Sequence, residues 1–155
     1  MTSTANMFYA CINLKRVNLN GWDTSALTNI LSMFYYCYNI ESIDMRGWDF
    51  SKVSTANAKT VFGVCYKLTD LKMDSTLSFA ACTQMTSMFD GCYMLENNPL
   101  NGATIEMNKV TTLTTMFAHN WSLVEMDMTN WDFTAVTTTT NMFQNCFSLR
   151  KVIFP

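Results

Sequence analysis

Residues 33–49 read Met33-Phe34-Tyr35-Tyr36-Cys37-Tyr38-Asn39-Ile40-Glu41-Ser42-Ile43-Asp44-Met45-Arg46-Gly47-Trp48-Asp49. Written as a rule, this is Met-Phe-x-x-Cys-x-x-Leu-x-x-Ile-x-Met followed by Trp-Asp three residues later, and it fits the 155-residue chain six times. The units start at Met7, Met33, Val61, Met88, Met116 and Met142, with spacings of 26, 28, 27, 28 and 26 residues. A period in this range is typical of solenoid proteins, in which each unit forms one coil.

Two segments of each unit have different periodicities. The apolar-x-apolar pair, such as Ile43 and Met45, alternates in and out and predicts a short half-buried strand. Segment 22–34 carries apolar residues at i, i+3, i+6 and i+7, which predicts a short helix capped within 23–25. We therefore expect an α/β repeat solenoid with one short strand and one short helix in each coil. A parallel β-solenoid is the alternative if the Thr-rich segments are extended.

Two units depart from the rule. The fourth unit places Asn98-Pro99-Leu100 where the others have the strand pair. Trp48 lies thirteen residues before the next unit start, against eleven elsewhere, which predicts a two-residue insertion within Ser51–Lys59. Neither change interrupts the repeat, so we expect one repeat domain of about six coils over residues 1–155.

The repeats resemble the leucine-rich-repeat family of BspA-type bacterial surface proteins. Units of that family carry Met-Phe-x-x-Cys-x-x-Leu-x-x-Leu-x-Leu followed by Trp-Asp-x-Ser-x-Val, and the resemblance covers nearly the whole chain. It implies a right-handed superhelix with a parallel sheet on one face, displayed outside the cell or on its surface and linked to adhesion. The residue after each Cys is aromatic here, where the family usually has a small polar one.

The cysteines form a column and not a redox or metal site. Five of the six occupy the same slot of their units, and Asn120 fills that slot in the fifth unit. Asn and Cys share small size and hydrogen-bonding capacity, whereas they do not share thiol chemistry. No Cys-x-x-Cys is present, and thiols in register suit neither tetrahedral zinc nor a disulfide. We expect buried structural thiols, with Cys82 filling an ordinary apolar position.

Composition and motifs exclude several classes of function. A net charge of −2 and a pI near 5.2 argue against binding to nucleic acid or to an anionic membrane. No apolar run approaches the ~20 residues of a spanning helix, and the N-terminal residues have no signal-peptide pattern. His119 is the single histidine, and no catalytic triad, paired-carboxylate motif or phosphate-binding loop is present. We expect a non-enzyme without cofactor or metal.

An aromatic column is the first candidate site. The slot after the Cys slot holds Ile12, Tyr38, Tyr66, Tyr93, Trp121 and Phe147. These rings either pack on one another as a ladder or form an exposed stripe, which Tyr35 and Tyr36 would widen. An exposed stripe of this kind would offer a large rigid contact area to a protein or to sugar rings.

The outward residues of the strands are the second candidate. Asp44, Lys72 and Asp127 represent this polar face, in which charges of both signs alternate. Such a face is either simply solvated or a polar binding surface, because solenoids commonly bind through one of their faces. Calcium at Asp70 and Asp74 has no loop motif to support it.

The ends of the chain suggest a third possibility. No polar terminal cap is visible before Met7 and Phe8 or after Val152, Ile153 and Phe154. We therefore expect either an excerpt of a longer repeat array or subunits that stack head to tail, which would form a filament. The preferred function is a surface-displayed adhesion or interaction module that binds a protein or a glycan. The alternative is a structural subunit whose partners are copies of itself.

Overall fold

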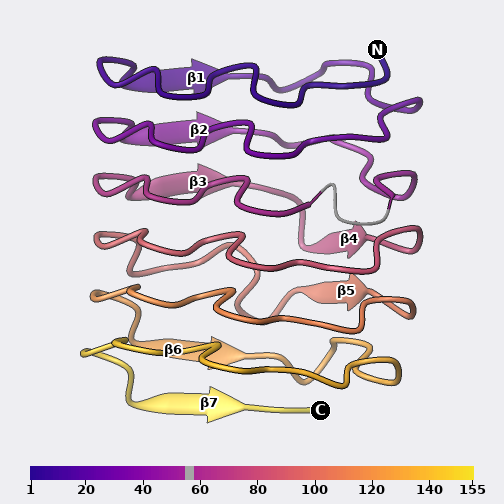
Figure 1. The fold of residues 1–155 in the computed structure, drawn as a ribbon, viewed down its shortest axis with the longest axis vertical. Helices are drawn as coiled ribbons and strands as arrows, with labels where there is room; N and C mark the ends of the chain where they lie inside the picture. The colour runs from indigo at the N-terminus through magenta and orange to yellow at the C-terminus, as the bar shows by residue number, and fades with distance from the viewer. Residues whose placement is uncertain (55–57) are drawn as a thin grey trace.

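The computed structural model describes residues 1–54 and 58–155, and it shows a parallel β-solenoid of about five turns (Figure 1). The described residues contain no helix, so the expected helix in each coil is wrong and the alternative, a parallel β-solenoid, is confirmed. The two-residue insertion expected within Ser51–Lys59 involves positions 55–57, which lie outside the described residues.

Seven three-residue strands make up three parallel sheets. The first sheet pairs β1 (Arg16–Asn18), β2 (Ser42–Asp44) and β3 (Asp70–Lys72); β6 (Glu125–Asp127) pairs with β7 (Lys151–Ile153). These five strands lie on one side of the stack, and β4 (Thr76–Ser78) and β5 (Thr104–Glu106) pair on the other (Figure 1). Pairs such as Ile43↔Leu71 put the middle residue of each strand over its equivalent in the next coil. The apolar-x-apolar pattern therefore predicted the strands of the first side correctly.

The fourth unit has no strand on that side, as its sequence suggested. Asn98 Oδ1 accepts a hydrogen bond from the Leu100 N–H at 2.9 Å, which folds this segment into a turn. Pro99 has no N–H to give to a sheet ladder. The sheet formed by β1, β2 and β3 therefore does not continue into β6 and β7.

Left-handed backbone positions explain why the segments before and within Met-Phe-x-x-Cys are not helical. In every unit the residue before the unit start and the residue before the Cys slot have positive φ, as at Ser32 (52°) and Tyr36 (65°). Positive φ at two positions four residues apart interrupts the right-handed conformation that a helix requires. The expected cap is instead a local turn, in which Asp23 Oδ1 accepts from the N–H of Ser25 at 3.1 Å.

The backbone hydrogen bonds alternate between the coil itself and its neighbour. The Phe34 N–H donates to the Val61 carbonyl of the next coil at 2.8 Å, whereas the Cys37 N–H donates to the Phe34 carbonyl of its own coil at 3.0 Å. The same alternation recurs from coil to coil. It satisfies the buried backbone groups with strands of only three residues.

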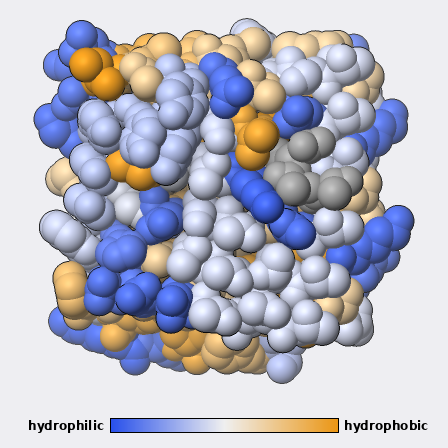
Figure 2. Space-filling view, in the orientation of Figure 1, coloured by the Kyte–Doolittle hydropathy of each residue, from blue (hydrophilic) through white to orange (hydrophobic). Residues whose placement is uncertain are grey.

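The core is a stack of identical layers. Phenylalanines from the six units form an inner ladder of near-parallel rings with centroids 5.1–5.8 Å apart: Phe8, Phe34, Phe62, Phe89, Phe117 and Phe143. The surface in the view of Figure 1 is mostly white to blue, and hydrophobic residues gather along its upper and lower edges (Figure 2).

The cysteine column ties each coil to the one before it. Cys65 Sγ donates to the Phe34 carbonyl at 3.2 Å, and Asn120 Nδ2 donates to the equivalent Phe89 carbonyl at 2.7 Å. The shared hydrogen bond explains why Asn replaces Cys in this column. The six cysteines form no disulfide. Cys37, Cys65, Cys82 and Cys92 are buried, as expected, whereas Cys11 and Cys146 are half-buried.

Candidate interaction surface

The aromatic column forms a continuous outer ladder on the surface of the solenoid. Centroid distances along it are 5.1 Å for Tyr38–Tyr66, 4.3 Å for Tyr66–Tyr93 and 3.9 Å for Tyr93–Trp121. Trp121 lies 6.1 Å from Phe147 at an angle of 42°. The rings therefore pack on one another, while Tyr38, Trp121 and Phe147 also remain exposed to solvent. The packed ladder and the exposed stripe, which the sequence left as alternatives, are therefore both present in part.

Three more tyrosines extend the outer ladder at its N-terminal end. Tyr35 and Tyr36 stack at 4.1 Å, and Tyr36 lies 5.7 Å from Tyr38. Tyr9, which the sequence analysis missed, contacts both Tyr35 and Tyr36, at 5.9 and 5.8 Å. The repeat could have indicated this contact, because Tyr9 is the third residue of its unit, as Tyr35 is.

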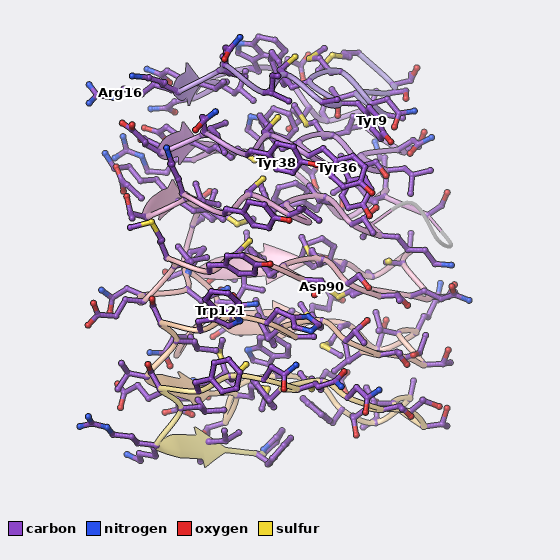
Figure 3. The ribbon with its side chains drawn as sticks, turned by 60° about the vertical axis from the view of Figure 1, so that its left-hand side comes forward. Tyr9, Arg16, Tyr36, Tyr38, Asp90 and Trp121 are labelled. Atoms are coloured by element: carbon purple, nitrogen blue, oxygen red, sulfur yellow. The ribbon has the colours of Figure 1, made fainter. Side chains whose placement is uncertain are left out.

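All six tyrosines of the chain thus belong to one set of rings in contact. We call this set, with Trp121 and Phe147, the aromatic face. Figure 3 shows its labelled members Tyr9, Tyr36, Tyr38 and Trp121 on one side of the stack. The concentration of one residue type on one face gives this surface a chemistry that the rest of the molecule lacks.

Backbone conformation positions the tyrosines. Tyr36 has a φ of 65° and stands in the same column as Gly91 and His119, which also have positive φ. Tyr35 lies over Gly63, where a Cβ would come within 2.8 Å of its ring. The absence of a side chain at Gly63 therefore lets the Tyr35 ring lie flat against the third coil.

Hydrogen bonds and partial burial raise the pKa of two tyrosine hydroxyl groups, those of Tyr35 and Tyr66. The hydrogen bond with Tyr36, and then burial, raise the pKa of Tyr35 to about 12. Burial, and then the hydrogen bond with Tyr93, raise the pKa of Tyr66. The negative charge of Asp90 makes the smallest contribution to both pKa shifts. Figure 3 shows Asp90 below Tyr36.

Asp90 and His119 form a pair that the sequence analysis did not find. Asp90 Oδ1 lies 2.8 Å from His119 Nδ1, and both side chains are about one third exposed, at 32% and 39%. The residues come from neighbouring coils. His119 therefore has a carboxylate partner that its position in the sequence did not indicate.

The strand face holds Asp44, Lys72 and Asp127, and they are separate from the aromatic face. Asp44 and Lys72 are neighbours in register on β2 and β3, whereas Asp127 lies on β6 beyond the fourth coil. The Arg46 guanidinium holds both oxygens of Asp44, at 3.0 and 2.6 Å, and lowers its pKa to about 2. Lys72 Nζ lies 3.4 Å from Asp70. These charges are partly neutralised by their own neighbours.

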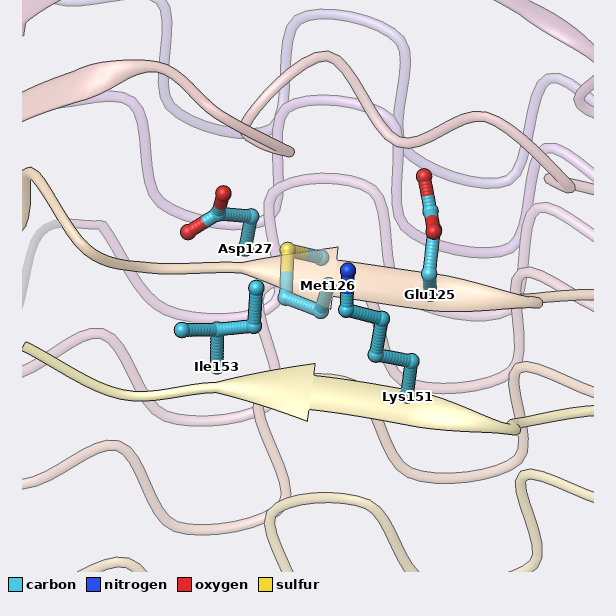
Figure 4. A pocket seen from close by; sticks show the side chains of 5 residues that line it. All are labelled: Glu125, Met126, Asp127, Lys151 and Ile153. Carbon is cyan, nitrogen blue, oxygen red and sulfur yellow. The ribbon is translucent and has the colours of Figure 1, made fainter.

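The hollow beside Asp127 is too small for a ligand of ordinary size. It lies between β6 and β7, measures about 50 Å³ and is lined by Glu125, Met126, Asp127, Lys151 and Ile153 (Figure 4). Sites for small molecules usually enclose several hundred Å³. A second hollow on the same face measures about 300 Å³ and is lined by residues on or beside β1, β2 and β3: Arg16, Glu41, Ser42, Thr69 and Asp70. The strand face is therefore a polar surface that also carries a larger hollow.

The residues expected in end-to-end assembly lie at opposite ends of the stack (Figure 1). Met7 is exposed, and Phe8 is the first ring of the inner ladder. Val152 and Ile153 are half-buried on β7, and Phe154 is exposed. Within one chain the two groups do not meet.

Metal-ligating side chains do not cluster in the described part of the chain: no three His, Cys, Asp or Glu side chains there are placed to hold a metal ion. Burial raises the pKa of Cys37 to about 11 and that of Cys65 well above its usual range, so these two thiols stay protonated. Residues 1–54 and 58–155 form no helix that is long and apolar enough to cross a membrane.

Comparison with known proteins identifies the family. The family profile described as "Mycoplasma protein of unknown function, DUF285" matches residues 1–101 and, in a second overlapping match, residues 59–154. Two overlapping matches are what an internal repeat produces. No curated protein and no solved structure matches the chain. The matches span nearly the entire sequence, and the chain therefore belongs to the DUF285 family.

Proposed function

We propose that this protein is a non-catalytic interaction module that binds a partner protein through its aromatic face. The observation that carries the proposal is the gathering of all six tyrosines, with Trp121, into one partly exposed set of rings. Tyrosine and tryptophan provide large, rigid contact areas that lose little conformational entropy on binding. Contiguous exposed aromatic residues on a protein surface usually mark an interface.

Ring geometry favours a protein partner over a glycan. Tyr66 has Tyr38 on one face at 5.1 Å and Tyr93 on the other at 4.3 Å. A sugar ring packs its C–H groups against an open aromatic face. Tyr66 and Tyr93, in the middle of the outer ladder, have no open face because each is covered by a ring on both sides. They present ring edges and hydroxyl groups, which suit the mixed polar and apolar contacts of a peptide chain.

The resemblance to BspA-type surface proteins supports display outside the cell or on its surface, and a role in adhesion. The strand face, with Asp44, Lys72 and Asp127, would then be a second polar contact area on another part of the same coils. It lies apart from the outer ladder, so a partner could contact one surface without the other.

Head-to-tail assembly is the second candidate. It is supported by the coil-to-coil bonding, because each coil uses the same row of N–H and carbonyl groups toward its neighbour. A second copy could meet that row through the regions of Met7, Phe8, Val152, Ile153 and Phe154. A chain that stays monomeric in light scattering at all concentrations would exclude this candidate.

The first experiment selects binders for the whole chain from a displayed random-peptide library, with an oligosaccharide array in parallel. We expect peptide binders whose affinity falls at least tenfold on the double substitution Tyr66→Ser and Tyr93→Ser. Ile153→Glu, a substitution on β7 away from the aromatic face, is the matched control and should leave their affinity unchanged. Binding of oligosaccharides alone would instead assign the face to a glycan.

A further inference from the structure

We propose that Asp90 is the docking point for an arginine or lysine side chain of the partner protein. This inference rests on the proposed function and names the chemistry that the partner must bring. Asp90 is the carboxylate that lies beside the outer ladder, on the side of the tyrosine pair Tyr35 and Tyr36. In Figure 3 it stands below Tyr36, and Trp121 belongs to the following coil.

The carboxylate has hydrogen-bonding capacity left. His119 Nδ1 occupies Oδ1 at 2.8 Å, and no described residue donates a hydrogen bond or an ion pair to Oδ2. A carboxylate accepts about four hydrogen bonds through its two oxygens. The side chain is 32% exposed, so a donor from outside can reach it.

The charge of Asp90 reaches two rings of the aromatic face. It is the smallest of the contributions that raise the pKa of Tyr35, after the hydrogen bond with Tyr36 and burial, and that of Tyr66, after burial and the hydrogen bond with Tyr93. A cation at this position would meet that negative charge and the phenol oxygens, which also accept hydrogen bonds.

Asp90 has no Lys or Arg partner among the described residues, and its side chain contacts His119. On the strand face, by contrast, Asp44 holds Arg46 through two hydrogen bonds, and Asp70 lies 3.4 Å from Lys72 Nζ. An arginine or lysine of another molecule can therefore pair with Asp90 without displacing a lysine or arginine of this chain.

Guanidinium fits this place better than ammonium. It is planar, pairs with a carboxylate through parallel N–H groups and packs along aromatic rings. It therefore contacts Asp90 and the edge of the Tyr66 ring together, and lysine supplies the charge without the flat contact. We expect arginine to be the more frequent residue at the corresponding position of the partner.

The test uses the peptides selected on the whole chain and compares Asp90→Asn with the matched variant Asp132→Asn, which lies beside β5 and outside both candidate surfaces. Peptides that depend on Tyr66 and Tyr93 should be rich in Arg or Lys. Their Kd in fluorescence polarisation should rise about tenfold with Asp90→Asn and stay unchanged with Asp132→Asn. Changing the basic residue of the peptide to Gln should give the same loss, and the two changes together should add little more.

The outcomes separate this inference from the proposed function. Peptides that depend on the two tyrosines but bind Asp90→Asn as tightly as the unmodified chain would overturn the docking point and leave the protein-binding face in place. A library without any binder that depends on these tyrosines would overturn both. Thermal melting should give Asp90→Asn the same transition temperature as Asp132→Asn, so that the loss of affinity reports the lost charge and not a disturbed fold.

Discussion

The inner and outer ladders both add one ring for each coil, but their surroundings differ. The phenylalanines Phe34, Phe62, Phe89 and Phe117 are wholly buried, whereas Tyr38 and Trp121 in the outer ladder are 36% and 43% exposed. Both follow from one rule, that equivalent residues of successive coils lie above one another. The comparison teaches that stacking alone does not assign a role. The inner ladder holds the coils together by burial, and the outer ladder keeps polar edges in contact with water.

The largest expected effect is the loss of stability when one ring of the inner ladder is removed. Phe89→Ala removes a fully buried ring that stacks on Phe62 and Phe117, and it should lower the free energy of unfolding by about 3–5 kcal/mol. Trp121→Ala in the outer ladder should cost only about 1 kcal/mol, because its ring is partly solvated. Denaturant titration of both variants measures the difference. Equal losses would mean that the outer ladder is a second core.

A smaller effect is expected at the position where the cysteine column is interrupted. Asn120 Oδ1 is buried without a hydrogen-bond partner, while Nδ2 makes the contact to Phe89 that a cysteine would make. Asn120→Cys removes the unpartnered oxygen and should stabilise the fold by about 1 kcal/mol. Asn120→Ala removes the donor as well, so it should be less stable than Asn120→Cys. Thermal melting of the two variants under reducing conditions checks the order.

The smallest effect concerns alkaline pH. The folded pKa of Tyr35, about 12, lies above its ordinary value of 10.0, so folding favours the neutral phenol. The stabilisation is complete below pH 10 and is lost as the pH rises toward 12. Tyr35→Phe should therefore reduce this loss and remove the last tyrosine from the ultraviolet titration of phenolate. If Tyr35→Phe instead lowered the absorbance change near pH 10 and left the change near pH 12 as it was, Tyr35 would ionise like an exposed tyrosine.

The sequence was sufficient to predict the features in which equivalent residues of successive coils lie above one another. The strand pairs, the buried thiols and the outer ladder all follow from equal positions in successive units. The helix prediction was wrong because apolar residues at i, i+3, i+6 and i+7 also arise when a coil turns at left-handed positions. Those positions hold residues such as Ser32, Tyr36 and Val64, and these residue types do not indicate a positive φ as glycine would.

The contact between Asp90 and His119 could not be predicted by aligning the equivalent positions of successive units. Asp90 is the third residue of its unit and His119 is the fourth residue of the next, so their side chains meet diagonally. The offset depends on how the two coils sit on each other, and one sequence does not contain that information. The same holds for Gly63, whose role beneath Tyr35 depends on the neighbouring coil.

The thiol contacts between coils have a consequence for chain length. Cys37, Cys65 and Cys92 donate to the carbonyl of the same phenylalanine position in the preceding coil, so donor and acceptor belong to different copies of one unit. A duplicated unit can therefore enter the stack with every donor already matched to an acceptor. The contacts persist although the thiol and its acceptor are 29, 31 and 30 residues apart in these three pairs, so a short insertion is absorbed within its own coil. The fold can thus grow or shrink by whole coils, and the length of its aromatic face would change by one ring at each step.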